Sequence, residues 1–97
     1  MTSQKKTIVI DFSEVATLSE ALKHIEKKME LPDYYGKNLD ALYDGLTDIS
    51  RATNIYLCKY SEFLKQNGKK GEYLMKVFAD AEVRNKNLFV LHDVREI

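Results

Sequence analysis

Three aspartates follow one another at intervals of four residues in the stretch "YYGKNLDALYDGLTDI", residues 34–49. They are Asp40, Asp44 and Asp48, and an α-helix would place them about one turn apart on one face. Carboxylates in this arrangement could serve in acid–base catalysis, bind a hard metal ion, or present negative charge to a cationic partner. Because like charges at this spacing weaken a helix by roughly 0.2–0.5 kcal/mol per pair, the row requires an explanation.

The apolar residues around the row predict the helix that carries it. They recur at helical spacing on the face opposite the aspartates: Leu39, Leu42, Leu46 and Ile49. Asn38 is a suitable N-cap for this helix, and Tyr43 and Thr47 fall at the boundary between its two faces. The stretch therefore predicts a helix with a buried leucine face and an exposed acidic face.

The rest of the chain predicts an α/β fold. Strands are expected at three short β-branched or aromatic runs: residues 7–12, 54–60 and 88–92. Further helices are expected at residues 17–29, 61–66 and 71–85. This β-α-α-β-α-α-β order favours right-handed crossovers between parallel strands. We expect two layers, with about four helices packed against a three-stranded parallel sheet.

Local signals mark several element ends and the core. Thr17 and Glu20 have the spacing of a capping box, Ser61 could open the third helix, and residues 67–71, "NGKKG", read as a turn. Five residues form the expected apolar stripe of the last helix: Tyr73, Leu74, Val77, Phe78 and Ala81. The expected core includes Ile8, Ile10, Leu22, Ile25, Leu42, Leu46, Ile55, Leu57 and Val90.

Composition restricts the classes of function. With 97 residues, 44% hydrophobic and 31% charged, the chain is expected to form one globular domain, residues 1–97. Lysine and arginine equal aspartate and glutamate at 15 each, so no global basic field favours nucleic acid or a membrane surface. The single cysteine and the absence of a secretory or membrane-length apolar run indicate a cytoplasmic setting.

The sequence does not favour an enzyme. Carboxylates on one exposed helix face, without a glycine-rich phosphate loop, form an open surface, so we expect no catalytic residues, no metal and no cofactor. Cys58 lies in an apolar run and reads as a small buried hydrophobe. His24 and His92 read as structural or solvated residues.

The segment "LPDYYGKNLDALYDGLTD", residues 31–48, resembles the signature of the barstar family, which are intracellular inhibitors of small microbial ribonucleases. The similarity extends through "KVFADA", residues 76–81, and through the order of strands and helices. The resemblance implies a barstar-like fold and a stoichiometric protein inhibitor that is a monomer when free. It also implies that the acidic helix and the loop before it enter the active site of the nuclease.

The resemblance also implies roles for individual residues. Asp44 matches the principal acidic anchor of the family and Asp40 the second acid. The remaining matches are contacts from the loop and the two helices: Tyr34, Asn38, Thr47, Val77 and Asp80. Tyr43 stands where the family usually has tryptophan, and Asp48 lengthens the acidic row; both are also predicted to bind the partner. The partner is expected to be an extracellular-type microbial ribonuclease. The alternative is an immunity or regulatory module for a different cationic protein.

Overall fold

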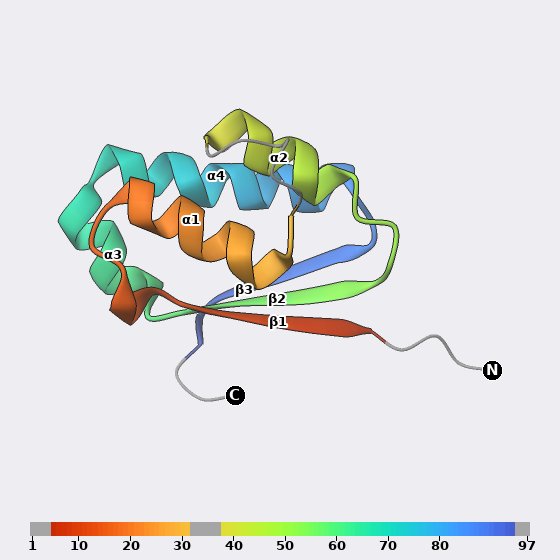
Figure 1. Ribbon diagram of the computed structural model, residues 1–97, viewed down its shortest axis with the longest axis horizontal. Coiled ribbons are helices and arrows are strands. Elements are labelled where there is room, and N and C mark those ends of the chain that lie inside the picture. Colours follow the sequence, from red (N-terminus) through yellow and green to blue (C-terminus); the bar gives the residue numbers. More distant parts are fainter. Residues whose placement is uncertain (1–4, 32–37, 95–97) are drawn as a thin grey trace.

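The structure, a computed structural model, describes residues 5–31 and 38–94 and shows an α/β fold (Figure 1). The elements follow the predicted order, with one short 3-10 helix added after the first strand. They are β1 (Lys6–Asp11), η1 (Phe12–Glu14), α1 (Leu18–Met29), α2 (Leu39–Thr47), β2 (Thr53–Cys58), α3 (Tyr60–Asn67), α4 (Lys69–Arg84) and β3 (Leu88–Val94).

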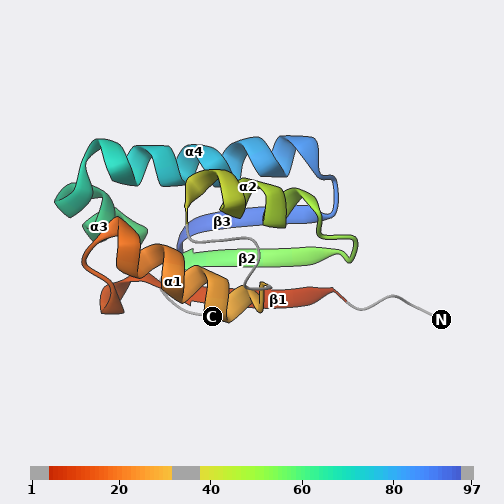
Figure 2. The same ribbon diagram turned by 45° about the horizontal axis from the view of Figure 1, so that its top comes forward.

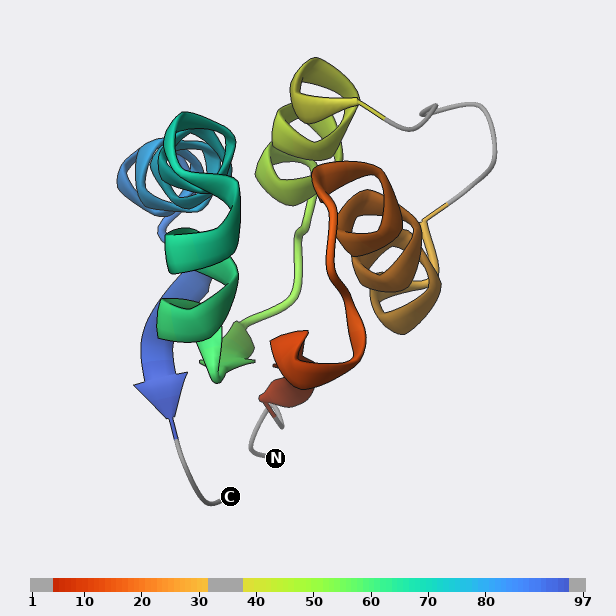
Figure 3. The same cartoon turned by 90° about the vertical axis from the view of Figure 1, so that its left-hand side faces the viewer.

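The three strands form one parallel sheet in the order β1-β2-β3. Ile8, Ile55 and Val90 share one register position across it. The helices α1, α2 and α4 lie on a single face of the sheet, with α2 between α1 and α4, and α3 lies near one end (Figures 1, 2 and 3). The predicted two-layer architecture with a three-stranded parallel sheet and four helices is confirmed.

The core lies between the sheet and the helices. All of the expected core residues are buried except Val90, which is half-buried and packs against the core. Val90 belongs to β3, which lies at one edge of the sheet. On the opposite face of the sheet, Phe89 and Leu91 are 52% and 41% exposed.

The local cap of α1 forms as predicted. The Thr17 hydroxyl oxygen accepts a hydrogen bond from the Glu20 backbone N–H at 3.2 Å, and the Glu20 carboxylate accepts one from the Thr17 N–H at 3.3 Å. This reciprocal pair is a capping box, which satisfies two backbone donors that a helix start leaves without partners.

The predicted start of the third helix is wrong. Helix α3 begins at Tyr60, one residue before Ser61, and follows Lys59, whose backbone is left-handed (φ 59°) and gives no side-chain cap. Tyr60 is buried and its ring makes an edge contact with Phe12 at 4.8 Å between centroids. Aromatic packing between elements, which the local sequence does not reveal, therefore sets this boundary.

The predicted turn over residues 67–71 is also wrong in extent. Gly68 alone separates α3 from α4, with a positive φ of 55°, and Lys69, Lys70 and Gly71 already belong to α4. The two helices meet closely at Gly71, where an added Cβ would lie 3.0 Å from Leu64 Cδ1 and 3.2 Å from its Cα. The Tyr60 hydroxyl donates to the Gly71 carbonyl. The absence of a side chain at Gly71 thus allows α3 and α4 to pack closely.

Tyr73 is not part of the apolar stripe of α4, contrary to the prediction. Its side chain is 54% exposed, whereas Leu74, Phe78 and Ala81 form the buried side of the helix. One residue corresponds to about 100° of rotation, so a position directly before Leu74 turns away from the core.

Within the described residues, none of the helices is both long and apolar enough to cross a membrane.

Candidate partner-binding surface

Helices α2 and α4 lie side by side and together carry most of the predicted contact residues (Figure 2). Tyr34 lies outside the described residues. The structure brings the rest of the predicted set onto two neighbouring helices: Asn38, Asp40, Tyr43, Asp44, Thr47 and Asp48 on or at the ends of α2, and Val77 and Asp80 on α4. Segments about thirty to forty residues apart in sequence thus contribute to adjoining surfaces.

Helix α2 presents Asp40 and Asp44 to solvent while Leu42 and Leu46 are buried beneath it. This division of faces was predicted from the spacing. Within the described parts of the chain, neither carboxylate has a hydrogen bond or an ion pair. Asp40 lies in the first turn, where the helix dipole favours a negative charge, but Asp44 lies beyond that benefit. Asp44 is therefore an exposed charge without compensation from its own helix.

The start of α2 is held by Asn38, as predicted. Its side-chain oxygen accepts a hydrogen bond from the Ala41 backbone N–H at 2.7 Å. The capping bond fixes this side-chain oxygen at the helix N-terminus. Substituting such a cap by alanine typically costs about 1 kcal/mol of stability, so Asn38 has a structural role whatever it contacts.

Gly45 gives α2 a close contact with the segment after α1. A Cβ at this position would lie 3.0 Å and 3.1 Å from the two terminal carbons of Leu31. Glycine inside a helix costs up to about 1 kcal/mol relative to alanine. The close approach of Leu31 explains why glycine suits this position, because the Cβ of an alanine here would require Leu31 to move.

Asp48 continues the acidic row although α2 ends at Thr47. It is the C-cap residue, it keeps a helical backbone (φ −83°, ψ −9°), and its N–H donates to the Asp44 carbonyl at 3.1 Å. Its side chain is exposed. The helix dipole disfavours a negative charge at this end. The third aspartate therefore adds to the acidic surface without any benefit from the helix terminus.

Tyr43 and Thr47 border the acidic face. Tyr43 is half-buried and packs against the core, so its ring position is constrained. The Thr47 hydroxyl donates to the Tyr43 carbonyl at 3.0 Å and to the Asp44 carbonyl at 3.1 Å. This hydroxyl is therefore directed at its own helix, and a partner would meet mainly the rest of the Thr47 side chain.

Asn85, which was not among the predicted residues, joins α4 to the end of α2. Its side-chain amide donates to the Leu46 carbonyl at 3.0 Å and to the Ile49 carbonyl at 2.8 Å. Its side-chain oxygen accepts from the Asn87 N–H at 3.0 Å, and only 8% of the residue is exposed. Asparagine directly after a helix is a weak signal in sequence, because the same residue commonly serves as a local helix stop.

Helix α4 presents a surface of mixed charge beside α2. Val77 is half-buried against the core. The Asp80 carboxylate lies 3.1 Å from Lys76 Nζ, and both side chains are largely exposed, at 52% and 71%. Arg84 is exposed one turn further along. The two cations, Lys76 and Arg84, were not predicted; their spacing of four residues from Asp80 was the available signal.

Of the two cavities described in this structure, one is lined by Asp48 and neither by Asp40 or Asp44. Within the described residues, no group of three or more histidine, cysteine, aspartate or glutamate side chains could hold a metal ion. Cys58 is buried, as predicted, and burial raises the pKa of its thiol. A raised pKa leaves less of the nucleophilic thiolate.

Two comparisons show which known proteins the chain is similar to. The chain matches the model of the family described as "Barstar (barnase inhibitor)" over residues 5–93. It is also 51% identical over 37 residues to a protein of Bacillus subtilis (strain 168) named "Putative ribonuclease inhibitor YrdF". That second match covers 38% of this chain and spans only 37% of the length of the relative.

Proposed function

The chain belongs to the barstar family, and on this premise we propose that it inhibits a small microbial ribonuclease by covering the active site with α2. The observation that carries the proposal is the pair of exposed carboxylates on α2, Asp40 and Asp44, which have no counter-charge within the described residues. A ribonuclease surrounds the scissile phosphate of RNA with cationic side chains, so this acidic face suits such a site.

The carboxylates act as substitutes for substrate phosphates. Arginine and lysine donors that bind phosphate oxygens also bind carboxylate oxygens, and arginine can bind either group with two parallel hydrogen bonds. Asp44 lies in the middle of the row and is the anchor in this proposal, with Asp40 as the second acid. Asp48 extends the negative field beyond the end of the helix.

The contacts that hold α2 in place support the proposal of a rigid inhibitor. The Asn38 cap holds one end of the helix, and Asn85 binds carbonyls at the other. Leu31 packs against the middle at Gly45. Because these contacts exist in the free protein, less conformational entropy is lost when the partner binds. Tyr43, already half-buried, adds apolar contact area at the rim at little further cost.

The remaining predicted residues have peripheral roles in this proposal. Tyr34 and Asn38 contact the partner from the loop side, Thr47 from the rim, and Val77 and Asp80 from α4. The protein itself performs no reaction. It binds the nuclease one to one in the cytoplasm, as a monomer when free, and protects cellular RNA.

A second candidate is an immunity or regulatory module for a different cationic protein. The observation that favours it is the pair of cations on α4, Lys76 and Arg84, beside the acidic row. They suit a partner with a cationic centre and an acidic rim, which need not be a ribonuclease. In both candidates, α2 provides the central contact.

The test is inhibition of a barnase-like ribonuclease measured with a fluorogenic RNA substrate. The wild-type protein should abolish cleavage at a one-to-one molar ratio, and the double variant Asp40→Asn/Asp44→Asn should lose this effect. The control is Glu14→Gln/Glu62→Gln, which removes two exposed acids from η1 and α3 and should inhibit like the wild type. No inhibition by the wild type, together with capture of another cationic protein through Asp44, would favour the second candidate.

A further inference from the structure

Helix α4 exposes two large apolar side chains, Tyr73 and Val83, to which the proposed inhibition assigns no role. Tyr73 is 54% exposed and Val83 is 89% exposed. At 100° of rotation per residue, Tyr73 lies within about 40° of both Val77 and Asp80 around the helix axis, whereas Val83 lies about 120° from Val77. Tyr73 therefore continues the side of α4 that carries the two predicted contacts, and Val83 points elsewhere.

Tyr73 stands beside the amino end of α2. The two helices lie side by side and run in the same direction (Figure 2). Asn85 donates to the Leu46 and Ile49 carbonyls, so the carboxyl ends of the two helices are level. Tyr73 precedes Asn85 by about 18 Å along α4, and Leu39 precedes the two carbonyl residues by about 10–15 Å along α2. The tyrosine is therefore about one helical turn beyond the first residue of α2.

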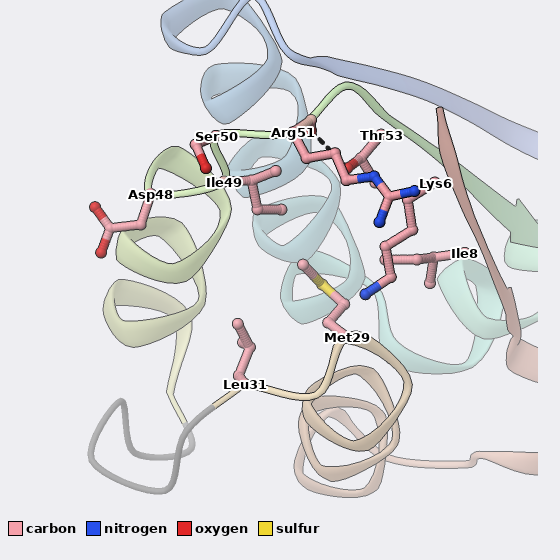
Figure 4. A pocket seen from close by; sticks show the side chains of 9 residues that line it. All are labelled: Lys6, Ile8, Met29, Leu31, Asp48, Ile49, Ser50, Arg51 and Thr53. Atoms are coloured by element: carbon pink, nitrogen blue, oxygen red, sulfur yellow. Dashed lines mark hydrogen bonds between the residues drawn. The ribbon is translucent and has the colours of Figure 1, made fainter. Parts of the chain in front are cut away.

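A contact with a nuclease needs more surface than α2 alone offers. The helix has nine residues, which is about 13 Å of length. A standard protein interface buries about 800 Å² on each partner, or a round patch roughly 30 Å across. On the α1 side, the surface beside the end of α2 is hollowed by a cavity of about 290 Å³, lined among others by Met29, Leu31 and Ile49 (Figure 4). A rigid partner meets less surface over a hollow, so the exposed side chains of α4 are the better source of the remaining contact.

We propose that Tyr73 contacts the nuclease directly and fits an apolar, uncharged patch beside its cationic active site. This inference rests on the proposed inhibitory function and adds one contact to it. Lys69 and Lys70 are exposed within one turn before Tyr73, so cationic groups of the partner are disfavoured at this position. Tyrosine suits an uncharged patch, because its rigid ring supplies a large contact area at a low entropy cost. Tyr73 then lies where the charged centre of the interface gives way to a neutral edge.

The test compares inhibition of a barnase-like ribonuclease by the wild type and three variants of the full chain. Tyr73→Ala should weaken inhibition about tenfold, mainly through faster dissociation of the complex. Tyr73→Phe keeps the ring and should inhibit like the wild type. Val83→Ala is the matched control, because it shortens an exposed apolar side chain of the same helix, and it should also inhibit like the wild type. Urea unfolding should give nearly the same midpoint for all four proteins, since both side chains are exposed.

Ionic strength separates this contact from the acidic one. The loss of affinity in Tyr73→Ala should be the same at low and high salt, because salt does not screen a neutral ring, whereas the loss in Asp44→Asn should shrink. A wild type that inhibits, together with a Tyr73→Ala variant that inhibits equally well, would overturn this inference alone. A Tyr73→Phe variant as weak as Tyr73→Ala would also overturn it, since the hydroxyl would then make the contact. A wild type that does not inhibit would overturn the proposed function and this contact with it.

Discussion

The exposed faces of α2 and α4 adjoin each other but treat acidic residues differently. Residues 39–48 contain three aspartates and no lysine or arginine, and Asp40 and Asp44 have no counter-charge within the described residues. On α4, Asp80 pairs with Lys76 at 3.1 Å, and Arg84 follows four residues later. Asp40 and Asp44 on α2 are thus charges without a counter-charge within the described residues, whereas Asp80 on α4 belongs to an ion pair.

The difference indicates where binding energy should concentrate. A charge without a local partner keeps its full attraction for a cationic surface, whereas an ion pair must open or lose part of that attraction. Protein interfaces commonly depend on a few residues surrounded by near-neutral contacts. We therefore expect α2 to supply most of the affinity for the partner, and α4 to modulate the rate and selectivity of association.

The largest effect should come from Asp44. Asp44→Ala should weaken inhibition of the ribonuclease by about 2–5 kcal/mol, because cationic groups of the enzyme would remain buried without a partner. Asp80→Ala is the matched control on α4 and should cost far less. The free energy of unfolding should change by no more than about 0.5 kcal/mol in either variant, since both side chains are exposed. Inhibition constants and urea unfolding measure the two quantities. Equal losses of affinity in the two variants would remove the distinction between the helices.

The next largest effect is expected at Asn85, whose side chain connects α4 to the end of α2. Asn85→Ala should destabilise the fold by about 1–3 kcal/mol, because the Leu46 and Ile49 carbonyls lose their buried donor. Asn87→Ala is the matched variant and should cost less, since within the described residues its side-chain amide donates to a single acceptor, the Ile49 carbonyl, at 3.3 Å. Urea unfolding, with one m-value fitted to both variants, tests this order of destabilisation. A larger loss of stability in the Asn87 variant than in the Asn85 variant would show that Asn85 does not hold the end of α2.

A smaller effect is expected at Arg84. Arg84→Glu should speed association with a cationic nuclease by about threefold to tenfold at low ionic strength, because it replaces repulsion by attraction near the acidic face. The gain should shrink as salt screens the charges. Lys70→Glu makes the same change of charge at the other end of α4 and serves as the control. Stopped-flow kinetics would measure both. Slower association of the Arg84 variant would instead indicate a partner with an acidic rim.

The smallest effect belongs to the Lys76–Asp80 pair. Lys76→Ala should change the free energy of unfolding by at most about 0.5 kcal/mol, since both partners are largely exposed and such pairs contribute little. Thermal unfolding at low and high salt provides the measurement. A loss well above that range would mean that the pair has a structural role and is not simply a neutralised acid.

Features that depend on neighbouring residues were predictable. The division of α2 into leucine and aspartate faces, the Asn38 cap and the Thr17 capping box all follow from spacings of three or four residues, and the structure confirms them. The β-α-α-β-α-α-β order and the parallel sheet were also predictable, because helices between apolar strands leave few ways to pack.

The sequence by itself thus determined the class of fold and the acidic face, since helical periodicity assigns each side chain of α2 to the core or to solvent. Only the tertiary structure decided the rest. The start of α3 at Tyr60, the close contact of Leu31 with Gly45 and the bonds from the Asn85 amide to the carbonyls at the end of α2 all depend on segments distant in sequence. Packing between elements overrides local preference there, because one buried aromatic ring or one satisfied buried amide outweighs a cap or a turn preference.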